Sequence, residues 1–178
     1  KDKFVVGHVG RLHPQKNHDF LIDVFAEIKK KKPDAELILV GTGPLEEKVK
    51  SKVIEKCLSD CVHFLGNRKD MNRIYQAMDV FVFPSLFEGL GIVAIEAQAA
   101  GVPIVCSEGL PPETDITPIY QKLLLSDGAE KWANVALEMA QNLKAHTNMQ
   151  QYVIDAGFDM DATAKYMESY YLNRWRTA

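Results

Sequence analysis

The sequence predicts an α/β domain in which a mainly parallel sheet of six strands is covered by helices on both faces. Short apolar runs alternate with amphipathic helical segments along most of the chain. These runs are apolar on both faces, which is typical of strands buried in a parallel sheet. With 178 residues, 47% of them hydrophobic and 25% charged, the chain is long enough for one core and has an ordinary globular composition.

The expected elements follow one another in the order strand then helix. The six strands are expected over residues 4–9, 37–40, 62–65, 80–83, 103–106 and 123–125. The helices between them are expected over residues 18–28, 45–56, 70–78 and 92–100, and the remainder of the chain is expected to be helical to its end. Asn17 is expected to cap the first helix and Gly101 to end the fourth. Such a doubly wound, Rossmann-like sheet binds ligands outside the carboxyl ends of its strands, so functional residues are expected just after the strands.

A first candidate site follows the first expected strand, in the segment 7–17. The strand ends in glycines, the loop carries Arg11 and Lys16, and a helix N-terminus follows. Free backbone N–H groups, the positive end of a helix and two cations favour an anion, and a diphosphate fits because arginine can bind two of its oxygens. A solvated loop with two ordinary cations explains this segment alone equally well. The dinucleotide motif G-x-G-x-x-G is absent, and Gly-Thr-Gly at 41–43 is explained by a turn between strand and helix.

A second segment, 83–103, is more specific. A glycine-rich loop follows a strand and opens a helix that carries Glu96 among apolar residues. Gly89 and Gly91 allow a ligand to come close to the backbone and its N–H groups. A carboxylate in an apolar helix is costly without a partner, and sugar hydroxyls are suitable partners for Glu88 and Glu96. The alternative is that Glu88 is a loop acid and Glu96 an exposed helix position, and two acids beside several glycines favour the ligand site.

The second segment resembles the donor-binding signature of glycosyltransferase family 4, retaining enzymes with the GT-B fold. The signature is carried by Ser-x-x-Glu-Gly-x-Gly at 85–91 and by the E-x7-E pair, Glu88 and Glu96. The match extends to Gly-Arg-Leu at 10–12 with Lys-Asn at 16–17, and to residues 41–44, 62–66 and 78–85. It therefore covers about residues 4–107 and, more loosely, the rest of the chain. Residues 96–101 and 111–117 most resemble the branch that builds bacterial capsular and exopolysaccharides.

The resemblance implies a role for individual residues. Arg11 and Lys16 would bind the donor diphosphate, together with Gly10, and neutralise the leaving group. Glu88 would contact hydroxyls of the transferred sugar and complete the catalytic set, and Glu96 would contact the ribose hydroxyls. Fixed donors aimed at developing charge would supply much of the catalysis.

The resemblance also implies contacts from the backbone and from a neighbouring loop. The sugar and phosphates would be held by backbone N–H groups around Gly89, Leu90, Gly91 and Ile92. The nucleobase would face the loop formed by Gly66, Asn67 and Arg68.

By the same resemblance, the chain would be part of a hexosyltransferase whose donor is a nucleotide diphosphate sugar, UDP-linked as is usual in the family. The sugar would be transferred to a glycan or lipid-linked acceptor in cell-surface polysaccharide synthesis. GT-B enzymes have two Rossmann-like domains, and residues 1–178 would be the C-terminal one. A C-terminal helix over about 159–178 would cross to the N-terminal domain, which would supply the acceptor site. The fragment is therefore expected to bind donor weakly and to transfer nothing. The alternative is a non-catalytic Rossmann-like module that binds a nucleotide or phosphate.

Composition and motifs also exclude several classes of function. A net charge of −3 gives no electrostatic basis for a nucleic-acid partner, and no apolar run is long enough to span a bilayer. Three cysteines are expected to be reduced packing residues, which indicates a cytoplasmic protein and leaves peripheral association of the full-length enzyme with the inner membrane face open. No metal or cofactor is expected, because Asp159-Met160-Asp161 is explained by helix capping and first-turn charge.

Overall fold

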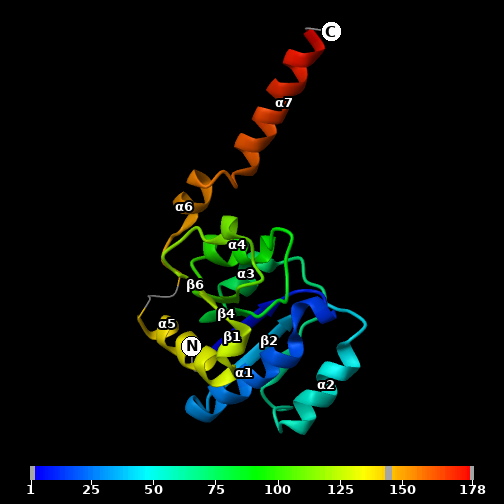
Figure 1. Ribbon diagram of the computed structural model, residues 1–178, viewed down its shortest axis with the longest axis vertical. Helices are drawn as coiled ribbons and strands as arrows, with labels where there is room; N and C mark the ends of the chain where they lie inside the picture. The colour runs from blue at the N-terminus through cyan, green and yellow to red at the C-terminus, as the bar shows by residue number, and fades with distance from the viewer. Residues whose placement is uncertain (1–2, 143–145, 177–178) are drawn as a thin grey trace.

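The computed structural model describes residues 3–142 and 146–176 and consists of a six-stranded parallel sheet between two layers of helices (Figure 1). The strands are β1 (Phe4–Val9), β2 (Ala35–Val40), β3 (Val62–Phe64), β4 (Val80–Phe83), β5 (Ile104–Ser107) and β6 (Tyr120–Leu123). The helices are α1 (His18–Lys31), α2 (Glu46–Glu55), α3 (Met71–Tyr75), α4 (Ile92–Ala99), α5 (Ala129–Asn142), α6 (Gln150–Asp155) and α7 (Met160–Arg176). Short 3-10 helices occupy Pro14–Lys16, Pro112–Thr114 and Leu125–Asp127. The predicted fold class is confirmed.

The order of strands places β1 and β4 side by side at the centre of the sheet. The sheet runs β3-β2-β1-β4-β5-β6, and every pairing in it is parallel. The order reverses between β1 and β4, where Val6 pairs with Val80 and Gly7 with Phe81. In a doubly wound sheet this reversal opens the crevice in which ligands bind. The loops after β1 and β4 therefore meet at the same edge.

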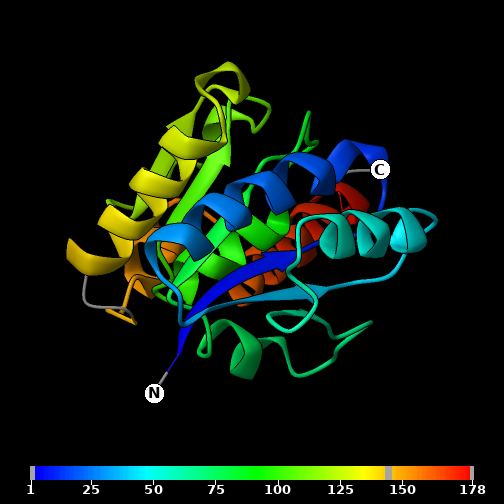
Figure 2. The same ribbon diagram turned by 90° about the horizontal axis from the view of Figure 1, so that it is seen from below.

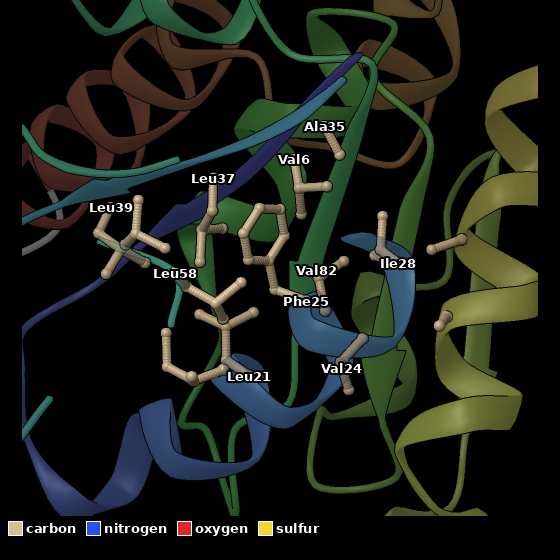
Figure 3. Packing of buried hydrophobic residues seen from close by; sticks show 14 of the residues in the cluster. Val6, Leu21, Val24, Phe25, Ile28, Ala35, Leu37, Leu39, Leu58 and Val82 are labelled. Atoms are coloured by element: carbon tan, nitrogen blue, oxygen red, sulfur yellow. The ribbon is translucent and has the colours of Figure 1, made fainter. Parts of the chain in front are cut away.

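Two hydrophobic cores hold the layers together. On one face α1 packs between α2 and α5, and its side chains Leu21, Phe25 and Ile28 bury themselves against the sheet (Figures 2 and 3). Phe25 lies over Val6 and Leu37 and has no exposed surface. The other face is covered by α3 and α4, and α6 contacts α4. Because both faces are buried, the strands need apolar residues on both sides, which is the pattern seen in the sequence.

Several expected boundaries and caps are wrong in detail. The last strand ends at Leu123 instead of covering 123–125, because residues 120–123 pair with β5 and Leu124 is exposed. Helix α3 is five residues long, much shorter than the expected 70–78. Asn17 does precede α1, but it has a left-handed φ of 53° and its side chain makes no capping hydrogen bond. Gly101 ends α4 as expected, with a φ of 72°.

The C-terminal helix α7 projects away from the body of the domain (Figure 1). Every side chain from Met160 to Trp175 is exposed, including Tyr166, Tyr171 and Leu172. Asp159 accepts a hydrogen bond at 2.5 Å from the backbone N–H of Ala162, and Asp161 lies in the first turn of α7. The interpretation of this pair as helix capping and first-turn charge is confirmed. No helix in the described part of the chain is long and apolar enough to cross a membrane.

Candidate functional site

The two loops that sequence analysis singled out are joined to one another at the β1–β4 edge. The backbone N–H of Leu86 donates to the carbonyl of Gln15 at 2.8 Å, and the Gln15 side-chain amide donates to the carbonyl of Phe87 at 2.8 Å. The ammonium of Lys16 lies 2.6 Å from Glu88 Oε1. These contacts join residues more than 70 positions apart. They place Lys16, which is predicted to bind the diphosphate, beside Glu88, which is predicted to bind the sugar.

The Lys16–Glu88 ion pair is almost buried. The side chains of Lys16 and Glu88 are 15% and 7% exposed, and the ammonium also lies 4.8 Å from the centre of the Phe83 ring. A Cβ on Gly10 would lie 3.2 Å from the Lys16 stem, so the glycine leaves room for the lysine to lie along the loop. An ion pair with little water around it holds its geometry better than an exposed one.

Arg11 stands apart from this pair. It is exposed, and its guanidinium has no hydrogen-bond or ion-pair partner among the residues that the structure describes. A guanidinium presents five donors in a planar fork, so Arg11 is free to bind an anion that reaches this edge. Lys16 is thus held in place by Glu88, and Arg11 is available to bind an anion.

Gly41 and Gly43, in the loop after β2, pack closely against the backbone of the loop after β1. A Cβ at Gly41 would lie 2.2 Å from the Gly10 carbonyl oxygen, and one at Gly43 would lie 2.4 Å from that of Leu12. The Leu12 N–H also donates to the carbonyl of Thr42. The two glycines therefore allow close backbone contact with the first loop, in addition to the turn expected from the sequence.

Gly89 and Gly91 differ in what they provide. Gly91 precedes α4 with a φ of 73°, a conformation that favours glycine. At Gly89 an added Cβ would meet nothing within 4 Å, so the protein itself does not require glycine there. Leu90 and Ile92 are exposed beside them. In the first turn of α4 the Ala94 N–H donates to the Gly91 carbonyl at 2.8 Å, which leaves the N–H groups of Ile92 and Val93 to suit an anion or a hydroxyl oxygen.

Glu96 is not in the environment that the sequence suggested. It is exposed on α4, and its carboxylate accepts a hydrogen bond at 2.8 Å from the hydroxyl of Tyr75 on α3. Burial, together with the Glu96 carboxylate, raises the pKa of Tyr75. Glu96 lines a hollow of about 400 Å³ between α3, α4 and Gln150 of α6. The expectation that this carboxylate is costly among apolar neighbours is therefore wrong, because Glu96 is an exposed helix position, as the alternative held, and has a hydroxyl partner.

The loop after β3 lies beside the loop after β2. The Gly66 carbonyl accepts from the Gly41 N–H at 2.9 Å, and Asn67 lies 3.4 Å from the Thr42 hydroxyl. Arg68 makes a two-point contact with Asp70, at 2.9 and 2.8 Å, which lowers the pKa of that carboxyl to about 2. The loop 66–68, which is predicted to face the nucleobase, is thus bonded to the loop after β2, and its Arg68 is paired with Asp70.

Three buried polar side chains were not predicted from the sequence. Gln98 on α4 donates to the carbonyl of Thr114 and accepts from the N–H and hydroxyl of Thr117, so it fixes the loop 111–117 to the helix. His8 donates to the Val82 carbonyl at 2.9 Å, and its ring lies 4.7 Å from that of His18. Burial lowers the pKa of both histidines, that of His18 to about 4. No motif signalled these residues, because each acts through contacts distant in sequence.

The described residues contain no group of three or more His, Cys, Asp or Glu side chains placed to hold a metal ion. All three cysteines are free, with Cys61 and Cys106 buried as expected. Cys57 is exposed, so its interpretation as a packing residue is wrong.

Comparisons with known proteins identify the family of this chain and similar folds. The family model described as glycosyl transferases group 1 matches residues 1–160. EpsF of Bacillus subtilis, which is named a glycosyltransferase, is 32% identical over 160 residues, covering 89% of this chain and 42% of EpsF. The D-inositol 3-phosphate glycosyltransferase of Corynebacterium jeikeium is 31% identical over 94% of this chain and 43% of that protein. The chain thus spans less than half the length of these relatives.

Solved structures show the same fold. Anabaena HepE in complex with UDP and glucose superposes with a TM-score of 0.77 and 24% identity, covering 94% of this chain and 49% of HepE. Sucrose-phosphate synthase from Thermosynechococcus elongatus gives a TM-score of 0.83 and 25% identity, covering 99% of this chain and 47% of that one.

Proposed function

The chain belongs to the family of glycosyl transferases group 1, and from that premise we propose that it is the domain that binds the nucleotide diphosphate sugar in a retaining enzyme of family 4. The single observation that carries the proposal is the contact between Lys16 and Glu88. A cation suited to phosphate and an acid suited to sugar hydroxyls lie side by side at the ligand edge of the sheet. A module that binds phosphate alone gains nothing from the acid.

The proposed diphosphate contacts are Arg11 and Lys16. An ammonium has three N–H donors, so Lys16 can remain near Glu88 and still donate to a phosphate oxygen. Arg11 has no competing partner among the described residues and can bind two oxygens at once. When the bond between the anomeric carbon and the diphosphate breaks, negative charge grows on the phosphate, and these two cations stabilise it.

The proposed sugar and nucleoside contacts surround this centre. Glu88 would accept hydrogen bonds from hydroxyls of the transferred sugar, with N–H groups around Gly89, Gly91 and Ile92 beside it. The Glu96 carboxylate would accept hydrogen bonds from the ribose hydroxyls, either in place of the Tyr75 hydroxyl or in addition to it. In the proposed reaction no metal takes part, and the acceptor hydroxyl replaces the diphosphate with retention of anomeric configuration.

The proposed whole enzyme needs a second domain. Because the chain spans less than half of its relatives' length, the acceptor site would come from the remainder, and this chain alone would bind donor weakly and transfer nothing. The exposed apolar side of α7 would dock against that second domain. The donor is proposed to carry UDP, supported by the UDP bound to HepE. Cell-surface polysaccharide synthesis in the cytoplasm is the proposed setting, supported by the sequence resemblance at 96–101 and 111–117 and by three free cysteines.

The test is calorimetric titration of the chain with UDP, GDP, ADP and UDP-glucose. We expect binding with one nucleobase preferred, and Arg11→Gln is expected to weaken it about 10- to 100-fold through loss of a charge-assisted contact. Arg174→Gln removes the same charge from α7 and serves as the matched control. Equal weakening by both variants, or no binding of any nucleotide at millimolar concentration, contradicts the proposal for this chain.

A further inference from the structure

We propose that Gln15 is a positioning residue that keeps Glu88 oriented towards the transferred sugar while Lys16 interacts with the diphosphate. The inference rests on the proposed function and adds a residue to which neither the motifs nor the comparisons assign a role. Gln15 precedes Lys16 in the loop after β1, and together the two residues face both oxygens of the Glu88 carboxylate.

Gln15 holds three successive residues of the glycine-rich loop. Its backbone carbonyl accepts from the N–H of Leu86, and its side chain donates to the carbonyl of Phe87 at 2.8 Å. The same amide nitrogen lies 3.5 Å from Glu88 Oε2. On the other side of the loop the Glu88 N–H donates to the carbonyl of Gly109. The segment 86–88 is therefore attached on two sides, and Gln15 supplies one of them.

The direction of the Gln15 amide follows from its partner. A carbonyl oxygen can only accept, so the NH₂ group of Gln15 must face Phe87, and its second N–H is then available to Glu88. At 3.5 Å that second contact is at the limit of a hydrogen bond and is much weaker than the 2.6 Å ion pair with Lys16. In the absence of donor, Lys16 therefore dominates the position of the carboxylate.

The balance changes when a diphosphate binds. Two negative phosphates attract the ammonium of Lys16 and weaken its hold on Glu88. The Gln15 amide is neutral and stays fixed by the Phe87 carbonyl, so it remains as a donor beside Oε2. Glu88 then keeps a fixed direction and can accept hydrogen bonds from the sugar without a further loss of side-chain entropy.

The experiment compares affinity for UDP-glucose with affinity for UDP. Gln15→Met keeps the length of the side chain but removes its donor, and the backbone contact with Leu86 is unaffected. We expect this variant to bind UDP within about twofold of the unaltered chain and to bind UDP-glucose about 5- to 10-fold more weakly, the cost of a lost polar contact. Gln121→Met, at an exposed position of β6, is the matched control and should change neither affinity.

A double-mutant cycle asks whether Gln15 acts through Glu88. The variant that combines Gln15→Met with Glu88→Gln should bind UDP-glucose no more weakly than Glu88→Gln alone. Additive losses, or equal losses of UDP and UDP-glucose affinity, overturn the proposal because they indicate an independent or merely structural role.

A second readout does not depend on any ligand. In the free chain, Gln15→Met should lower the backbone order parameters of Gly89 and Leu90, measured by ¹⁵N relaxation, relative to the Gln121→Met control. Unchanged order parameters overturn the positioning role. If the unaltered chain binds neither UDP nor UDP-glucose, the proposed function fails, and the relaxation data alone decide whether Gln15 fixes the loop.

Discussion

Removing Lys16 should destabilise the folded chain through the carboxylate that it leaves behind. In Lys16→Met, Glu88, which is 7% exposed in the unaltered chain, loses its ionic partner, and only the weaker Gln15 contact remains. Breaking a fully buried ion pair costs about 3–5 kcal/mol. Lys16 is 15% exposed and Gln15 stays, so we expect a smaller loss in unfolding free energy, about 2–3 kcal/mol.

Glu88→Gln and the double variant Lys16→Met/Glu88→Gln measure how much of the loss comes from the unpaired carboxylate. Glu88→Gln keeps a hydrogen-bond acceptor for Lys16 and should cost only about 1 kcal/mol. The double variant no longer buries an unpaired carboxylate, so it should cost about 1–2 kcal/mol less than the sum of the two single variants. Lys50→Met breaks an exposed pair with Glu46 and Glu47 and should cost less than about 1 kcal/mol.

The assay is urea unfolding followed by circular dichroism and by the fluorescence of Trp132, which is fully buried in the core. Trp175 on α7 is exposed in the folded chain, so its substitution by Phe in every variant removes its signal. If Lys16→Met costs no more than Lys50→Met, or if the cycle is additive, the argument that this pair is desolvated and coupled is refuted.

Three further predictions follow from the glycines, the buried histidines and α7. Gly89→Ala should leave the unfolding free energy within about 0.5 kcal/mol, because a Cβ meets nothing within 4 Å, but should weaken UDP-glucose binding by calorimetry; unchanged binding would show that no ligand approaches this backbone. Burial lowers the pKa of His18 from 6.5 to about 4, so between these pH values the unfolded chain binds a proton at His18 that the folded chain does not. The contribution of His18 to the unfolding free energy should therefore fall by up to about 3 kcal/mol between pH 6.5 and 4, and buried His8, whose pKa is also lowered, adds to the fall. Urea unfolding across this range should show a shallower fall for His18→Leu than for the unaltered chain, and equal slopes would contradict the assignment. Truncation after Gly157 should leave the melting temperature within about 2 °C and abolish the self-association that light scattering should detect for the full chain, because α7 is exposed along its length; a full chain that stays monomeric at high concentration would contradict this.

The sequence predicted the fold well because strand burial in a doubly wound sheet leaves a local signal. The apolar runs of β1 and β4 gave their bounds without error. The last strand was misplaced because three consecutive leucines at 123–125 look like a strand, whereas pairing with β5 fixes 120–123. Register is set by a neighbouring strand, and that information is not local.

The contact between the two candidate loops was predictable for the same reason. Topology brings the ends of β1 and β4 together, so the meeting of Lys16 and Glu88 follows from the fold class. The environment of Glu96 was predicted wrongly from its neighbours in the sequence, because adjacent residues in a helix point in different directions. Gln15 gave no signal, because an amide that donates to a distant carbonyl has no motif.

The central claim is that the edge formed by the loops after β1 and β4 binds a nucleotide diphosphate sugar. Backbone amide shifts of the ¹⁵N-labelled chain, recorded during titration with UDP-glucose, test it most directly. The account predicts shifts in the loop 10–17, at Glu88 and in the first turn of α4, with little change on α2 or α7. Shifts confined to other surfaces, or none at millimolar UDP-glucose, would contradict it.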